Sequence, residues 1–159
     1  MTTDDTPATR QPLTHKHVAL TIKDERDVEV LSRTMTLTHR QRHNALTNRL
    51  LKALPQHTLL ESVETDCLFD VLIKKYDGKH DLLVEAKSDD SRAQLRMAIG
   101  QLFDYWFTLY GATTPHLAIL LPHRPDEAIF KLLAWREIHL MWFEGDQLCA
   151  TKPLNAHLT

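Results

Sequence analysis

Hydrophobic and polar positions are most sharply patterned between residues 70 and 87. Two apolar runs, 71–73 and 82–84, flank the dipeptide Asp77-Gly78, which is typical of a hairpin with a two-residue turn. With that turn, Tyr76 pairs with Lys79, and the numbers of every two facing residues add up to 155. The pattern therefore predicts an antiparallel hairpin with a defined register.

The acidic residues of this hairpin are the first candidates for chemistry. The register places Asp70 directly opposite Glu85, with Cβ atoms about 5 Å apart. Lys87 shares the face of Glu85, because side chains alternate along a strand. The other face is apolar and predicted to be core: Val71, Ile73, Leu82, Val84 and Ala86.

Two interpretations of this face stay open from spacing alone. Like charges directly across a ladder destabilise it, and a divalent cation held by carboxylate oxygens would neutralise Asp70 and Glu85. The Lys87 ammonium could then interact with a phosphate or with a polarised water, as in a metal-dependent phosphodiesterase. The other interpretation is an ordinary hairpin whose charges face water, since a longer loop would shift the register.

Residues 91–110 form the clearest helical pattern. Apolar residues recur at helical spacing, at Leu95, Ile99, Leu102, Trp106 and Leu109. Gln101 and Tyr105 lie one turn apart beside this stripe, and their polar ends need hydrogen-bond partners, so a purely structural role explains them poorly. Arg92 and Arg96 lie at the opposite flank.

The remaining pattern predicts an α/β fold with a mixed central sheet flanked by helices. The continuous apolar run of residues 116–121 is typical of a strand buried on both faces. Strand 81–87, helix 91–110 and strand 116–121 would form a right-handed parallel crossover. Further elements are expected at 38–54 (helix), 58–63 (strand), from Pro125 (helix), 139–143 (strand) and 148–150 (strand).

Length and composition favour one domain of residues 13–151. Residues 1–12 are rich in Thr, Asp and Pro and are predicted to be a disordered tail, and 152–159 a second tail. Two short β-prone runs, 16–22 and 28–32, predict a hairpin within 13–33 that is appended to the core. With 159 residues and 43% apolar residues the chain can bury a core.

Charge and cysteine usage narrow the class of protein. The net charge of −2 and pI near 6.5 differ from the basic footprint of an autonomous tight nucleic-acid binder. They favour weak or partner-assisted contact with DNA and do not exclude nuclease chemistry, since catalytic carboxylates lower the net charge. No run approaches 18 apolar residues, so no membrane span is expected. Cys67 and Cys149 alone favour a reducing cytoplasm.

The helix expected at 38–54 is the most basic part of the chain. No acid occurs between Arg33 and Leu60. This face is a candidate phosphate-contacting surface, and a solvated helix face is an equally good interpretation. The candidate nucleic-acid-binding residues are Arg40, Arg42, Arg49, Arg92 and Arg96.

The combined motifs resemble the PD-(D/E)xK nuclease superfamily. They comprise an acid opening one strand (Asp70), Glu85-Ala86-Lys87 on the next, and Gln-x-x-x-Tyr (Gln101 to Tyr105) on the following helix. The last motif is similar to the RecB-type branch, and residues 98–105 resemble small restriction-like and defence-associated nuclease domains. Phe69 stands where the name-giving proline would. The resemblance covers about residues 36–143.

This resemblance implies a restriction endonuclease-like core, αβββαβ with a further helix and strand, and Mg²⁺-dependent hydrolysis of DNA. Asp70 and Glu85 would hold one or two Mg²⁺ ions, which Mn²⁺ would replace, with the Ala86 carbonyl as a third ligand. Lys87 would orient the attacking water or stabilise the transition state. Gln101 would tie the helix to the metal-site waters or to the DNA backbone, and Tyr105 would fix Gln101 or contact a phosphate.

The resemblance also bears on His43. In RecB-type relatives a residue on the first core helix can join the metal site, and His43 is the candidate here. A buried structural histidine is an equally good interpretation, and Asn44 is a weaker rival for the ligand role.

Other classes of function remain open. The runner-up is a non-catalytic nuclease-fold module that binds DNA or a partner protein in a restriction or defence assembly; a ribonuclease or toxin-like effector is a third idea. A chain this small has little surface for sequence readout, which favours specificity from a homodimer or from another subunit of a defence complex.

Overall fold

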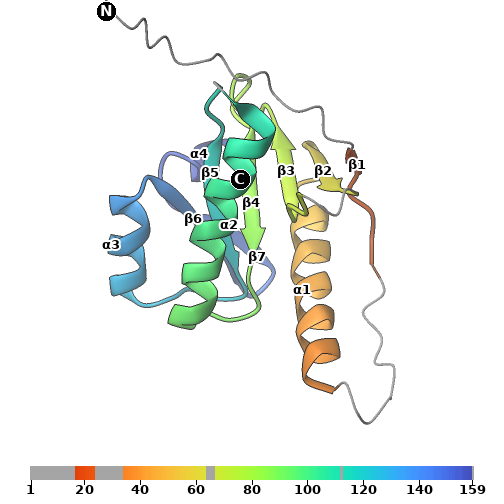
Figure 1. The fold of residues 1–159 in the computed structure, drawn as a ribbon, viewed down its shortest axis with the longest axis vertical. Helices are drawn as coiled ribbons and strands as arrows, with labels where there is room; N and C mark the ends of the chain where they lie inside the picture. The colour runs from red at the N-terminus through yellow and green to blue at the C-terminus, as the bar shows by residue number, and fades with distance from the viewer. Residues whose placement is uncertain (1–16, 24–33, 64–66, 112, 159) are drawn as a thin grey trace, which may run out of the picture.

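The structure is a computed structural model that describes residues 17–23, 34–63, 67–111 and 113–158, with the side chains of the first long helix described from Gln41 onward. Within these residues the chain forms a mixed seven-stranded sheet with helices on both faces (Figure 1). None of the helices in these ranges combines the length and the apolar character needed to cross a bilayer.

The strands lie side by side in their order along the chain, from β1 to β7. The strands are β1 (His17–Ala19), β2 (Thr58–Ser62), β3 (Val71–Lys74), β4 (Leu82–Ala86), β5 (His116–Leu121), β6 (Ile138–Glu144) and β7 (Gln147–Ala150). The helices are α1 (Thr34–Ala53), α2 (Arg92–Tyr110), α3 (Glu127–Trp135) and α4 (Asn155–Leu158).

The register predicted for the central hairpin is confirmed, but the predicted turn is wrong. Val71 faces Val84 and Ile73 faces Leu82, so facing residues add up to 155. The strands end at Lys74 and resume at Leu82; the connection between them is wider than two residues, and Tyr76 donates its N–H to His80, not to Lys79. Side chains alternate between the two cores along both strands, and this alternation is enough to define a register even where the turn differs.

Two crossovers make the centre of the sheet parallel. Strand β4 pairs in parallel with β5, and β5 with β6, while the other neighbours are antiparallel. Helix α2 makes the first crossover, as predicted, and α3 makes the second. Ser91 caps α2 by accepting the N–H of Gln94, and Asp126 caps α3 by accepting the N–H of Ile129, which satisfies helix-end donors.

The sheet separates two hydrophobic cores. The face predicted to be core packs against α1 and α4 and contains Val71, Ile73, Leu82, Val84 and Ala86. The other face, with Leu72 and Leu83, packs against α2 and α3. The α2 residues Leu95, Ala98 and Leu102 lie in this second core. The hairpin face that carries Glu85 is therefore covered by α2, and it is not open to water as the ordinary-hairpin interpretation required.

Of the two ends of the predicted domain outline, only the C-terminal one is seen to differ within the described residues. Strand β1 pairs antiparallel with β2, whereas its predicted hairpin partner at 28–32 lies outside the described residues, as does the predicted tail 1–12. Residues 152–158, predicted as a tail, lead into α4, where Leu154 and Leu158 are buried in the core beside α1. The predicted start of α1 at Thr38 is four residues later than the helix itself, which begins at Thr34.

Candidate active site

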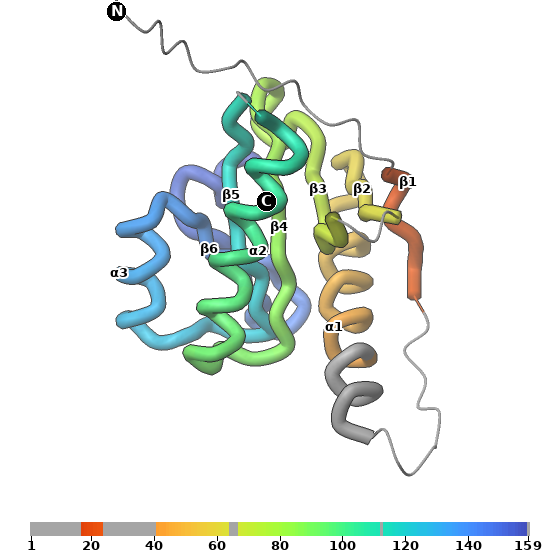
Figure 2. Tube along the Cα trace, in the orientation of Figure 1, coloured from red at the N-terminus to blue at the C-terminus, as the bar shows by residue number. Residues whose placement is uncertain are grey.

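Four elements bring the predicted site residues to one end of the sheet. Asp70 precedes β3, Glu85 is the penultimate residue of β4, and Lys87 follows that strand directly. Helix α2 starts at this end of the sheet (Figures 1 and 2). Asp70 Oδ2 accepts the backbone N–H of Ala86 at 2.8 Å, which joins the two strands beyond their ladder.

Glu85 is the most unusual residue of this group. Its exposed fraction is 2%, and only one of its carboxylate oxygens has a partner, because Lys87 donates to Oε1 at 2.7 Å and Oε2 is buried without a hydrogen bond. A buried charged acceptor without a partner is costly. Burial, and then the charge of Asp70, raise the pKa of Glu85 to about 8 despite the nearby Lys87 ammonium.

A chain of hydrogen bonds links this carboxylate to helix α2. Lys87 Nζ donates to Gln101 Oε1 at 2.7 Å, and Gln101 Nε2 donates to Tyr105 Oη at 3.1 Å. Burial, and then the charge of Glu85, raise the pKa of Tyr105 to about 12. The Gln-x-x-x-Tyr motif therefore meets the Glu-x-Lys motif through one ammonium group.

His43 reaches the group from α1. Its Nε2 lies 3.2 Å from Asp70 Oδ1, and both side chains are partly exposed. Burial lowers the pKa of His43, but the hydrogen bond and charge of Asp70 outweigh burial and leave the pKa above its ordinary value. His43 thus lies beside the site as an ion-pair partner of Asp70. This contact does not decide between a metal-ligand role and a structural role for His43.

The arginine candidates are dispersed. Arg49 is held by the Gly145 carbonyl and lies over the Phe143 ring at 4.0 Å. Arg42 is exposed and, with Arg49 and Ser88, lines a cavity of about 190 Å³ beside the segment that follows Lys87. Arg92 and Arg96 are exposed on α2, and the side chain of Arg40 lies outside the described part of the chain.

The residues present fit a hard divalent ion bound by oxygen. Asp70 and Glu85 offer two carboxylates, one with a buried oxygen that lacks a partner. The Ala86 carbonyl faces the same side of β4 as the Ala86 N–H, which binds Asp70, because the N–H and C=O of a strand residue face the same neighbour. Mg²⁺ is typically bound by one or two carboxylates and keeps several waters. However, Asp70, Glu85 and His43 do not bring three potential ligand atoms close together. Among the described residues, such a group of three occurs elsewhere in the fold.

That different place is a histidine-rich cluster at the opposite end of the sheet. Asp77 and His80 on the β3–β4 connection meet His116 at the start of β5, with one potential ligand atom from each within 4.8 Å of the others. Burial alone would raise the pKa of Asp77, but hydrogen bonds from His80 and Lys79 outweigh it and hold the pKa well below its ordinary range. Burial and the neighbouring His80 lower the pKa of His116.

The sequence analysis did not find this cluster. A usable signal was present: histidines occur just before β4, at the first residue of β5 and near the start of β6, and the starts of neighbouring parallel strands meet at one end of a sheet.

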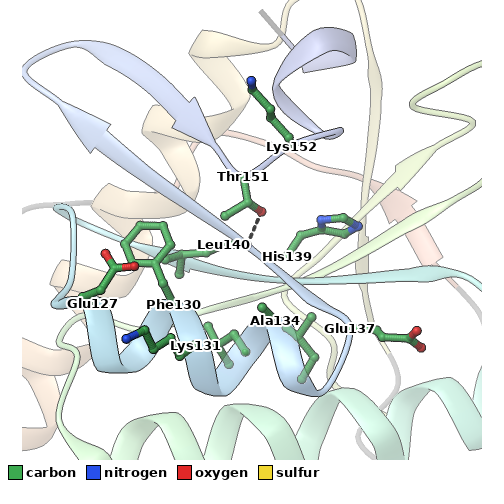
Figure 3. A pocket seen from close by; sticks show the side chains of 11 residues that line it. Glu127, Phe130, Lys131, Ala134, Glu137, His139, Leu140, Thr151 and Lys152 are labelled. Atoms are coloured by element: carbon green, nitrogen blue, oxygen red, sulfur yellow. Dashed lines mark hydrogen bonds between the residues drawn. The ribbon is translucent and has the colours of Figure 1, made fainter.

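The two larger cavities lie away from the candidate active site. One of about 460 Å³ lies between α3, β6 and residues 151–152, where Thr151 Oγ1 accepts the N–H of Leu140 (Figure 3). Another, of about 540 Å³, lies between the C-terminal parts of α2 and α3, and His116 of the histidine-rich cluster is one of its lining residues. Neither contains a residue of the candidate active site.

No protein-family model, curated protein or solved structure matches this chain. Inferences about its chemistry therefore depend on the residues and their arrangement.

Proposed function

We propose that the protein is a metal-dependent deoxyribonuclease with a PD-(D/E)xK site formed by Asp70, Glu85 and Lys87. The observation that carries this proposal is Glu85 Oε2, a buried carboxylate oxygen without a partner beside a second carboxylate. A cation bound between these two acids would relieve the repulsion of their charges and provide a partner for the buried oxygen. Four motif residues, from Glu85 through Lys87 and Gln101 to Tyr105, form one chain of hydrogen bonds, and Asp70 accepts the N–H of Ala86 beside it. A purely structural hairpin does not require this arrangement.

Phosphodiester hydrolysis is slow because the transition state accumulates negative charge and water is a weak nucleophile. Mg²⁺ held by Asp70, Glu85 and the Ala86 carbonyl would polarise a phosphate oxygen and lower the pKa of the attacking water. Lys87 would orient that water or contribute positive charge toward the phosphate. Gln101 would hold the Lys87 ammonium in position through its Oε1, and Tyr105 would hold the Gln101 amide in turn.

DNA would approach the end of the sheet where α1 and α2 flank the site. Arg42 and the cavity that it lines lie beside the segment following Lys87, which suits a phosphate next to the scissile one. The net charge of −2 favours help from a second copy of the chain or from another subunit of a restriction or defence complex. We place this activity in the cytoplasm, where cysteines such as Cys67 and Cys149 stay reduced.

The decisive experiment is cleavage of supercoiled plasmid and single-stranded DNA with Mg²⁺ or Mn²⁺, compared with EDTA, with RNA substrates in parallel. The wild-type chain should cut DNA only with the metal, and Glu85→Gln should not cut. Glu127→Gln, which removes an exposed carboxylate on α3, should cut as well as the wild type. Metal-dependent cleavage that is equal in wild type and Glu85→Gln would exclude this site as its source.

One observation favours a second candidate function, a non-catalytic module that binds DNA or a partner protein. The four ionisable groups pair with one another without any metal, Lys87 with Glu85 and His43 with Asp70. A site closed in this way could be purely structural. Retention of labelled DNA without cleavage, equal for wild type and Glu85→Gln, would support this module and exclude the nuclease.

A further inference from the structure

The cluster of Asp77, His80 and His116 lies far from the proposed nuclease site. Asp77 and His80 are on the β3–β4 connection, at the upper end of the sheet in Figure 1, whereas α2 begins at the lower end. Five residues of extended chain separate His80 from Glu85, roughly 16 Å at about 3.3 Å per residue. The two groups therefore cannot share an ion.

We propose that Asp77, His80 and His116 form a binding site for a divalent transition-metal ion, with Zn²⁺ as its preferred occupant, that fastens the β3–β4 connection to the start of β5. One ligand atom of each residue already lies within 4.8 Å of the other two. Around a tetrahedral Zn²⁺ with bonds of about 2.1 Å, ligand atoms lie about 3.4 Å apart. Shifts of the side chains on the order of 1 Å would therefore bring the three ligand atoms to the distances that Zn²⁺ requires.

The backbone holds these residues together without a metal. Gly78, with a φ of 86°, lets the connection turn back, and Asp77 Oδ1 accepts the N–H groups of Lys79 and His80 at 2.9 and 2.6 Å. His116 donates its own N–H to the Asp81 carbonyl at 2.9 Å. The site thus joins segments about 36 residues apart with little conformational entropy left to lose.

The side chains are also oriented by neighbours. The rings of His80 and His116 are stacked with their centroids 4.5 Å apart. Buried Tyr76 bonds through its hydroxyl to His116 Nδ1, which leaves Nε2 as the nitrogen for a metal. Such a partner on the far nitrogen is the usual way in which a protein orients a histidine ligand.

One contact would be replaced when the metal binds. His80 Nδ1 lies 2.7 Å from Asp77 Oδ2, so a proton now occupies the position between two potential ligand atoms. A metal ion that takes both atoms releases that proton to solvent. Three protein ligands leave the fourth tetrahedral position to water, and the partly exposed side chains of Asp77 and His80 leave a path for the ion.

The donor set predicts which ion binds. Two imidazole nitrogens and one carboxylate suit Zn²⁺, Ni²⁺ or Cu²⁺, whereas Mg²⁺ prefers oxygen ligands only. Millimolar Mg²⁺ should therefore leave Zn²⁺ bound here. This separates the cluster from the oxygen-rich group around Glu85 and makes the two proposals independently testable.

The test uses the full chain, stripped with a chelator and titrated with Zn²⁺ by calorimetry in the presence of excess Mg²⁺, with Co²⁺ absorption as a second readout. His80→Gln and His116→Gln should each bind one Zn²⁺ equivalent fewer than the wild type, and should lose the visible Co²⁺ bands of a low-coordinate site. His123→Gln, which removes an exposed histidine of the loop after β5, and Glu85→Gln should bind as the wild type does.

A thermal measurement tests the fastening role. Zn²⁺ at about 100 times its dissociation constant should raise the wild-type melting temperature by roughly 5 °C or more, and should raise that of the two variants far less. Circular dichroism of the metal-free variants shows whether they fold; His80, on the connection, is the safer substitution. Unchanged Zn²⁺ stoichiometry in both folded variants, or loss of the ion in Glu85→Gln instead, would overturn the proposal.

Discussion

Lys87 and Gln101 form a hydrogen bond of 2.7 Å that connects the end of strand β4 to the middle of helix α2. Because Lys87 also binds Glu85 Oε1 at 2.7 Å, its ammonium cannot turn toward solvent without breaking two charge-assisted bonds. The positive charge of Lys87 is therefore held in one position before any substrate binds. Such preorganisation is what allows a fixed charge to stabilise a transition state.

Replacing Lys87 with alanine should abolish DNA cleavage and leave the fold intact. We expect a fall of at least about 100-fold in rate, the scale on which removal of one preorganised charge acts. Gel assays of metal-dependent cleavage measure the rate, and circular dichroism checks the fold. Lys131→Ala, at an exposed position on α3, is the matched control. Full activity of Lys87→Ala would show that its ammonium has no part in the reaction.

Tyr105 should behave as a positioning residue. Tyr105→Phe removes the oxygen that accepts the Gln101 Nε2–H, so the amide that holds Lys87 becomes free to rotate. We expect a several-fold lower kcat with little change in KM, because a hydrogen bond of this kind is worth about 1 kcal/mol. Tyr110→Phe, which removes a similar hydroxyl bonded to Asp81, should leave both constants unchanged. An equal effect of the two substitutions would indicate a purely structural role.

Asp70→Asn should weaken Mg²⁺ and Mn²⁺ binding, which calorimetry measures directly. The same change should alter two neighbouring groups without any metal present. The charge of Asp70 raises the pKa values of both His43 and Glu85, so both should fall in the variant, and NMR titration can follow each one. Unchanged metal affinity would remove Asp70 from the ligand set, and unchanged pKa values would contradict the described contacts.

Metal binding should depend on pH through Glu85. With a pKa of about 8 in the metal-free protein, the carboxyl carries a proton at pH 7, and Mg²⁺ must displace it. The apparent affinity for Mg²⁺ should therefore rise by up to about tenfold per pH unit below 8 and level off above it. Calorimetry at several pH values tests this slope. A flat profile between pH 6 and 8 would mean that Glu85 is already ionised.

The same raised pKa makes a prediction about stability. Between the ordinary value of 4.5 and about 8, the folded state binds the Glu85 proton more tightly than the unfolded state does. The free energy of unfolding of the metal-free protein should therefore fall as pH rises through this range. The glutamine of Glu85→Gln cannot ionise. The melting temperature of this variant, relative to that of the wild type, should therefore rise from pH 6 to pH 9. A constant difference across this range would contradict the prediction.

Local pattern was sufficient for much of this protein. Apolar spacing predicted α2 to within a residue or two of its ends, and alternation predicted which hairpin residues face the α1 core. It also predicted that Asp70 would lie beside Glu85, although the turn at Asp77-Gly78 was wrong. Pattern succeeds here because the hydrophobic period belongs to each element alone and constrains the register whatever the connecting loop does.

Tertiary structure alone decided the properties that matter for chemistry. The sequence could place Glu85 on a face, but only the packing of α2 against that face made it buried, left Oε2 without a partner and raised its pKa. Likewise, His116 meets Asp77 and His80 only because β5 lies parallel beside β4. Burial and long-range proximity depend on how elements pack together. A local sequence pattern contains no information about a contact between residues about 36 positions apart.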